Sequence, residues 1–113
     1  MKLIAAIIRP YLLDDVRHAL EKLGRIIAIT EIKTYDPRPT TAHSYRGGEY
    51  PAELVSKIKI ELIVPANQAE KAIEIIRKAA LTGHAGDGYI GIMTVERFVR
   101  IRTGEVVVDE PGH

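Results

Sequence analysis

The sequence has 113 residues, with 16 Lys and Arg against 15 Asp and Glu, and a formal net charge of +1 at pH 7. The absence of cysteine excludes disulfides, a thiol nucleophile and a thiolate metal site, and the balanced charge argues against nucleic-acid binding. No apolar run approaches the roughly 20 residues that span a bilayer, so we expect no direct membrane insertion. The length is that of a single domain over residues 1–113, and the lack of cysteine is consistent with a cytoplasmic protein.

The first part of the chain predicts a strand, a helix and a second strand. Residues 3–8 form a continuous apolar run, which is typical of a strand buried on both faces. Apolar residues then recur at helical spacing over residues 13–23, and Gly24 is the expected end of this helix. Residues 26–33 are rich in β-branched side chains and predict the second strand.

Residues 34–55 have neither helical nor strand periodicity and predict a long loop. A loop of this length in a small domain is uncommon and is usually functional or disordered. The segment also holds Tyr45, Arg46 and Tyr50, and exposed Tyr and Arg are residue types that anchor protein interfaces. We therefore interpret this loop as a docking element for a partner protein, in preference to a passive linker.

The second part of the chain repeats the order of the first. Residues 57–64 alternate between polar and apolar side chains and predict a third strand. Asn67 and Glu70 have the spacing of a capping box, and residues 69–80 behind them place their apolar side chains on one helix face. Gly83 is the expected end of this second helix.

Residues 89–95 predict a fourth strand, residues 98–102 should continue extended, and residues 106–108 could add a short last strand. The order βαβ, long loop, βαβ (βαββαβ) predicts an α+β, ferredoxin-like split βαβ fold with both helices on one sheet face. One helical layer leaves the second apolar face open, so we expect that face to meet another subunit. A two-layer monomer with a hydrophobic back face is the alternative.

Residues 82–88 carry the strongest local signal for chemistry. Three glycines between a helix and a strand allow left-handed backbone and can form an anion-binding nest, although a simple flexible turn is the alternative. In an extended segment Arg100 and Arg102 would point to the same side and offer two guanidinium groups to phosphate. The glycine loop and this arginine pair flank one strand and together predict a phosphate site, where Asp87 could accept hydrogen bonds from ribose hydroxyls or backbone.

Other kinds of chemistry find little support. The four histidines lack metal-ligand spacing, and no nucleophile, base and orienting residue form a catalytic set. We therefore expect no metal site, no catalytic residues and no enzyme. A small nucleotide-hydrolysing enzyme built on the same loop and arginines is the alternative from another class, and phosphate release on the order of 1 s⁻¹ would support it.

The whole chain resembles the PII signal-transduction proteins, which are cytoplasmic trimers with a ferredoxin-like fold. The resemblance is carried by stretches along the entire sequence: Ile7 to Pro10, Leu13 to Arg17, Thr30 to Lys33, Tyr45 to Tyr50, Thr82-Gly83, Gly86 to Gly88 and Arg100 to Glu105. It implies that residues of about 36–55 are the family's T-loop, which docks into a membrane transporter or a metabolic enzyme.

The resemblance also implies an adenine nucleotide effector (ADP, AMP or ATP) in the clefts between the subunits of a homotrimer. Phosphates would lie on the glycine-rich loop 82–88 and on the arginines of the C-terminal loop 100–113, and the base would lie near an apolar pocket wall. The residues carried over to this nucleotide site are Ile63, Gly86, Asp87, Gly88, Tyr89, Arg100 and Arg102.

Some positions depart from the family's pattern. Arg38 stands where typical members have the glutamine that binds 2-oxoglutarate with Mg-ATP, and a cation cannot coordinate Mg²⁺ as an amide oxygen does. Tyr89 replaces a phosphate-binding lysine. The chain is therefore expected to be a divergent PII-like member that binds AMP or ADP at least as well as ATP and does not respond to 2-oxoglutarate. A conventional nitrogen-regulatory PII that responds to ATP, ADP and 2-oxoglutarate is the alternative.

A small anion such as bicarbonate could then replace 2-oxoglutarate as the second effector. The cations expected to hold it are Arg9, Arg38, Arg46 and Lys57. On the T-loop, Tyr45, Arg46 and Tyr50 are expected partner contacts or modification sites. Tyr50 matches the tyrosine that is uridylylated in some members of the family.

Overall fold

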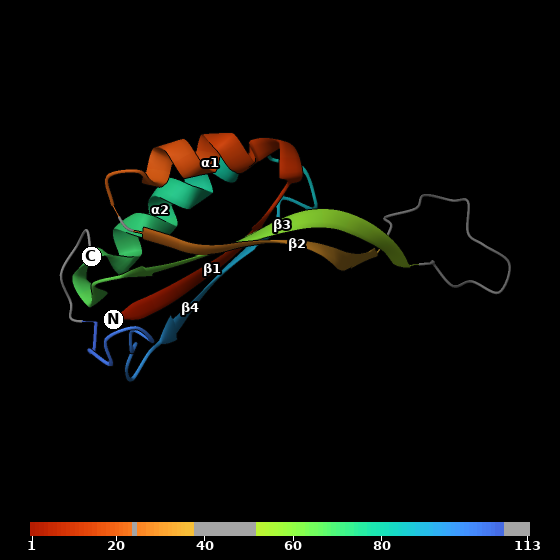
Figure 1. Ribbon diagram of the computed structural model, residues 1–113. Coiled ribbons are helices and arrows are strands. Elements are labelled where there is room, and N and C mark those ends of the chain that lie inside the picture. Colours follow the sequence, from red (N-terminus) through yellow and green to blue (C-terminus); the bar gives the residue numbers. More distant parts are fainter. Residues whose placement is uncertain (24, 38–51, 108–113) are drawn as a thin grey trace, which may run out of the picture.

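The computed structural model describes residues 1–23, 25–37 and 52–107 (Figure 1). It contains four strands, two α-helices and two short 3₁₀ helices: β1 (Lys2–Ile8), η1 (Pro10–Leu12), α1 (Leu13–Leu20), β2 (Arg25–Pro37), β3 (Ala52–Val64), η2 (Ala66–Gln68), α2 (Ala69–Ala80) and β4 (Tyr89–Thr94). This order confirms the α+β, ferredoxin-like split βαβ fold.

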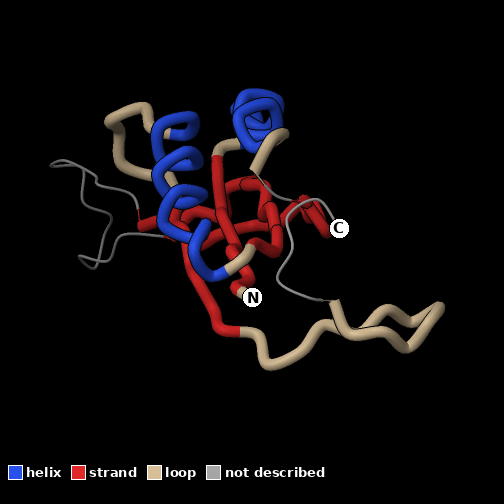
Figure 2. Tube along the Cα trace, turned by 90° about the vertical axis from the view of Figure 1, so that its left-hand side faces the viewer, coloured by secondary structure: helices blue, strands red, loops and turns tan. Residues whose placement is uncertain are grey.

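The strands form one antiparallel sheet in the order β2-β3-β1-β4, and both helices cover the same face of it (Figures 1 and 2). The register defines two ends of the sheet. At one end Ile7 of β1 pairs with Tyr89, and at the other end Lys2 pairs with Thr94. Because β3 extends past the end of β1, the β2–β3 hairpin leaves the sheet at the Ile7 end.

The core lies between the helices and one face of the sheet. In β1 the buried residues Ile4, Ala6 and Ile8 alternate with partly exposed ones, so this strand is buried on one face only. The expectation of burial on both faces is therefore wrong for the single chain. Leu3, Ala5 and Ile7 belong by alternation to the face that no helix covers. The buried set comprises Ile4, Ala6, Ile8, Val16, Leu20, Leu23, Ile58, Ile60, Leu62, Val64, Ala69, Ala72, Ile76 and Ala80.

The two βα junctions repeat each other in detail. The amide of Leu12 donates to the carbonyl oxygen of Arg9 at 3.0 Å, and the amide of Gln68 donates to that of Pro65 at 2.9 Å. Each bond closes a 3₁₀ turn that leads directly into the following α-helix. The capping box is wrong, since Asn67 lies inside η2 and the N-cap of α2 makes no side-chain hydrogen bond.

Both helices end earlier than the sequence predicts. α1 stops at Leu20, and Leu23 is buried in the turn that follows; Gly24 lies outside the described residues. α2 stops at Ala80, because Leu81 is already extended with φ −75° and ψ 125°. Gly83 is therefore not a helix terminator and belongs to the loop that follows α2.

The β2–β3 hairpin is longer than expected. The ladder continues without interruption to the pair Pro37 and Ala52, so the predicted loop is wrong for residues 34–37 and 52–55. In this outer part of the hairpin the side chains of the pair Tyr35 and Leu54 are exposed, and those of Thr34 and Val55 are partly exposed. Without a buried face among these described side chains, no alternation marks the strands in the sequence. The remainder of the predicted T-loop, residues 38–51, lies outside the described residues.

Candidate functional site

The carboxylate of Asp87 organises the glycine-rich loop 82–88. Its Oδ2 accepts hydrogen bonds from the amides of Thr82 and Gly83, both at 2.9 Å. Its Oδ1 accepts from the Thr82 hydroxyl and, at 3.1 Å, from Nε of Arg9. Asp87 is the last residue but one of the loop and its donors lie at the start, so the carboxylate closes the loop on itself.

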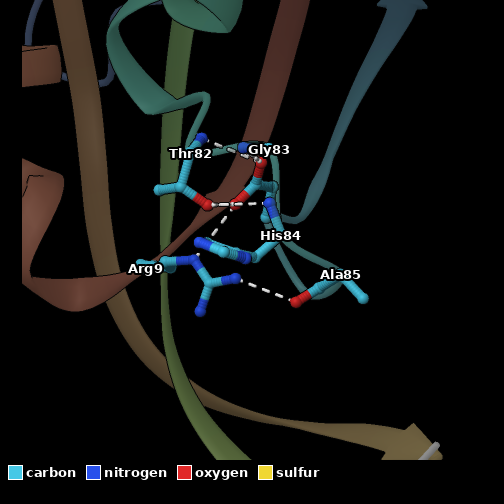
Figure 3. Close-up of polar contacts among 6 residues, drawn as sticks. Arg9, Thr82, Gly83, His84 and Ala85 are labelled. Atoms are coloured by element: carbon cyan, nitrogen blue, oxygen red, sulfur yellow. Dashed lines mark hydrogen bonds and ion pairs between the residues drawn. The ribbon is translucent and has the colours of Figure 1, made fainter.

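Arg9 ties this loop to the end of β1. Its backbone stays extended after the strand, with φ −66° and ψ 138°, before η1 begins. Besides the ion pair with Asp87, its Nη2 donates to the carbonyl oxygen of Ala85 at 2.9 Å (Figure 3). Among the described residues Nη1 has no hydrogen-bond partner, so part of the guanidinium remains available to an anion.

These hydrogen bonds hold Asp87 in its charged form. The Thr82 hydroxyl is the largest cause, and the amides of Thr82 and Gly83 and the guanidinium of Arg9 add to it; partial desolvation opposes them. The pKa of the Asp87 carboxyl is consequently far below its ordinary value. At neutral pH the loop therefore contains a permanent internal anion.

Two glycines of the loop are required for different reasons. Gly86 has φ 94°, a conformation that side chains rarely adopt. Gly88 has φ 113°, and a Cβ atom there would lie 1.8 Å from the carbonyl oxygen of Ile7. The loop thus passes against the backbone of β1 so closely that only glycine fits at position 88.

The arginine pair lies in a hairpin turn, which contradicts the predicted extended segment. Val99 and Val106 form a β-bridge, and Ile101 to Thr103 are the turn between them. The amide of Arg100 donates to the carbonyl oxygen of Glu105 at 2.9 Å, and that of Gly104 donates to Arg100 at 2.8 Å. Alternation along a strand therefore does not place Arg100 and Arg102 on one side. Of the predicted last strand 106–108, Val106 forms the bridge, Val107 is not in a strand, and residue 108 lies outside the described residues.

Within one chain the glycine loop and the arginine pair do not form one site. The loop enters β4 at Tyr89, whereas the hairpin with Arg100 and Arg102 follows the other end of the strand at Thr94 (Figure 1). Six residues of strand span about 20 Å. The predicted joint phosphate site is therefore wrong for a single chain.

Apolar surface lies beside the glycine loop. A cavity of about 390 Å³ is bordered by the C-terminal half of α2, the end of β1 and the loop, with Ile76 and Ile90 among its walls. Tyr89 stands at this cavity and is 79% exposed. Ile63 lies on β3 opposite Leu3, whereas Lys59 of β3 lies opposite Ile7 at the end beside the glycine loop. Ile63 is therefore four strand positions, or about 13 Å, away from that end.

The predicted anion site is described only in part. Lys57 lies on β3 and is 3% exposed, and Arg9 is held in the loop as described above. Arg38 and Arg46, with the T-loop residues Tyr45 and Tyr50, lie outside the described residues. In the described parts of the chain no three His, Asp or Glu side chains are grouped as metal ligands. No helix found there has the length and apolarity needed to cross a membrane.

Sequence reasoning missed the contribution of Thr82 and the connection between Arg9 and the loop. Thr82 shares its hydroxyl between the Asp87 carboxylate and the amide of His84, to which the distance is 3.2 Å. A threonine followed by Asp at the fifth position is a recognisable local signal for such a closed loop. Nothing in the sequence alone places Arg9 beside residues almost 80 positions away.

Comparison with known proteins gives matches over nearly the whole chain. A family model described as nitrogen regulatory protein P-II matches residues 1–105. A nitrogen regulatory protein P-II of Bradyrhizobium diazoefficiens is 44% identical over 110 residues, which cover 96% of this chain and 98% of the relative. The protein of the same name from Mesorhizobium japonicum is 46% identical with the same coverage. Nitrogen regulatory protein GlnK of Escherichia coli strain K12 is 42% identical over 106 residues, or 93% of this chain and 95% of the relative.

Proposed function

The chain belongs to the nitrogen regulatory protein P-II family and is a regulatory protein, not an enzyme; from this premise we propose that it forms a homotrimer that senses adenine nucleotides. The nucleotide binds in the clefts between subunits and sets the conformation of the T-loop. The T-loop in turn controls a target protein, either a membrane transporter or a metabolic enzyme. The lack of cysteine fits action in a reducing cytoplasm.

The observation that carries this proposal is the separation of the glycine loop from Arg100 and Arg102. Both motifs suit phosphate, but they flank opposite ends of β4 in one chain. In a closed ring of subunits the arginine hairpin of one chain can meet the glycine loop of the next. Each complete phosphate site would then require two chains, which supports a nucleotide site in the cleft between them.

The uncovered sheet face supports the same assembly. Leu3, Ala5 and Ile7 of β1 are only partly exposed there, and Ile63 of β3 lies on the same face by alternation. A neighbouring subunit packed on this face would bury apolar surface that a small single domain leaves open. Ile63 then offers an apolar wall to the base, while the phosphates lie toward Gly86 and Gly88.

Two observations favour different second effectors, namely 2-oxoglutarate and a small anion such as bicarbonate. The relatives are named nitrogen regulatory proteins, which favours the conventional response to ATP, ADP and 2-oxoglutarate. Arg38 in place of a glutamine, and Tyr89 in place of a lysine, favour a site that binds AMP or ADP at least as well as ATP. We propose the latter, with a small anion such as bicarbonate held by Arg9 and Lys57 together with cations of the T-loop.

Isothermal titration calorimetry of the full chain tests both alternatives. AMP, ADP and ATP are titrated separately, each with and without Mg²⁺, 2-oxoglutarate and bicarbonate. We expect micromolar or tighter binding of ADP or AMP, no enhancement by 2-oxoglutarate, and tighter nucleotide binding with bicarbonate. ATP-selective binding that 2-oxoglutarate strengthens would support the conventional alternative instead. No binding of any nucleotide would contradict the proposed function as a whole.

A further inference from the structure

The two halves of the glycine loop differ in whether their backbone amides already donate hydrogen bonds to side chains of the protein. At its start the amides of Thr82 and Gly83 donate to Asp87, and that of His84 donates to the Thr82 hydroxyl. At its end no side chain of the described residues accepts from the amides of Gly86 and Gly88. An incoming phosphate therefore meets a nest whose first half is filled by the protein's own carboxylate.

We propose that Asp87 is a positioning residue for the nucleotide site, and that it shapes the phosphate-binding half of the loop without touching the ligand. This inference rests on the proposed function, because it assigns a role within that nucleotide site. Both carboxylate oxygens already accept two hydrogen bonds each from Thr82, Gly83 and Arg9. That leaves little capacity for a hydrogen bond from a ribose hydroxyl to Asp87.

Arg9 and Thr82 complete the positioning unit from opposite sides. Arg9 reaches from the end of β1 to Asp87 and to the carbonyl oxygen of Ala85, so it fixes the middle of the loop to the sheet. Thr82 fixes its beginning. Gly86 lies between the residues held by these anchors and Gly88 follows directly after them, and both have positive φ values. The loop is thus preorganised for phosphate before any ligand binds.

The experiment compares adenosine with ADP, because both contain the ribose and only ADP contains phosphate. Binding is measured by calorimetry for the wild type, Asp87→Asn, Thr82→Val and Thr82→Ser. We expect Asp87→Asn and Thr82→Val to weaken ADP at least about tenfold, the effect of one charge-assisted hydrogen bond. Adenosine affinity should change less than about twofold, and Thr82→Ser, which keeps the hydroxyl, should bind ADP like the wild type.

A matched control removes a carboxylate elsewhere. Asp14 pairs with Arg17 at 3.2 Å on the exposed surface of α1, so Asp14→Asn should leave both affinities unchanged. An equal loss of adenosine and ADP in Asp87→Asn would overturn the inference in favour of direct ribose contact. Unchanged ADP binding in Asp87→Asn, or failure of Thr82→Ser to restore it, would also overturn it.

Hydrogen exchange of the ligand-free protein separates this inference from the proposed function. If the wild type binds no nucleotide, the proposed function fails, but the loop can still be examined. We expect the amides of Thr82 and Gly83 to exchange at least about tenfold faster in Asp87→Asn than in Asp14→Asn. Equal exchange in the two variants would contradict a positioning role for Asp87 independently of any ligand.

Discussion

At the scale of single residues, the site depends on a few side chains with several contacts each. Asp87 accepts from three residues and Arg9 donates to two. The glycines and Asp87 of this loop could be selected from the sequence, because spacing within one loop is local information. The part played by Arg9 could not, because it depends on the sheet register that brings the end of β1 beside the start of β4.

Gly88→Ala tests the close passage of the loop against β1. The added Cβ would lie 1.8 Å from the carbonyl oxygen of Ile7, so either the loop or the strand must move. We expect a loss of about 3 kcal/mol or more in the free energy of unfolding, measured by urea denaturation. Gly83→Ala is the control, because φ is 87° there but nothing lies within 4 Å of the new atom; a loss of about 1 kcal/mol is expected. Equal losses would contradict the role of the close contact.

Acid should remove the contribution of Asp87 to stability. Its folded-state pKa lies well below the ordinary value, so the contribution is fully present above the unfolded pKa and is lost as pH falls toward the folded pKa. We expect the stability difference between the wild type and Asp87→Asn to be constant near neutrality and to shrink below about pH 4. Urea denaturation at a series of pH values measures it. A difference that stays constant down to pH 2 would show that the carboxylate charge is not involved.

At the scale of elements, the sequence predicts best where one face is buried. The strands under the helices and the apolar face of α2 leave a clear alternation, and all four strands were placed correctly in their central parts. The extension of β2 and β3 beyond the helices could not be predicted, since a ladder with two exposed faces imposes no pattern on its side chains. The turn at Ile101 to Thr103 was missed for a related reason, because backbone hydrogen bonds alone define it.

Two substitutions on β3 compare the part of the strand that lies under the helices with the part that extends beyond them. Ile60 is fully buried under the helices, whereas Leu54 is 60% exposed on the hairpin beyond them. We expect Ile60→Ala to cost about 2–5 kcal/mol in the free energy of unfolding and Leu54→Ala to cost less than about 1 kcal/mol. Chemical denaturation of the two variants in parallel provides the test. A large loss for Leu54→Ala would indicate that the outer hairpin is buried by another surface.

At the scale of the whole molecule, the proposed site belongs to pairs of chains. The glycine loop and the arginine hairpin lie at opposite ends of β4, and a closed ring would join the two motifs of neighbouring subunits. The sequence suggested both motifs, and the family resemblance implied that they meet between subunits. Within one chain they are apart, because an extended strand separates its two ends as far as its length allows.

Mixed assemblies test this sharing of sites. One variant carries Arg100→Ala with Arg102→Ala, and the other carries Gly86→Glu, which places a carboxylate in the phosphate loop. Neither pure assembly should bind ADP. Co-expression with two different tags, followed by purification on both, yields mixed trimers, in which about one third of the clefts combine an intact loop with intact arginines. Calorimetry should detect that fraction. Complete absence of binding in the mixed assemblies would place both motifs in the site of a single chain.

The short strand β4 has a further consequence. Its first residue follows the glycine loop and its last residue leads to the arginine hairpin, with six residues of hydrogen-bonded backbone between them; in the proposed ring these two motifs would belong to neighbouring clefts. In such a ring, neighbouring clefts would be connected by β4, a strand whose length is fixed by its hydrogen bonds to β1. If the proposed ring forms and nucleotide binding shifts the loop of one cleft, β4 would carry that shift to the arginines of the next cleft, and successive dissociation constants for the nucleotide would differ from one another.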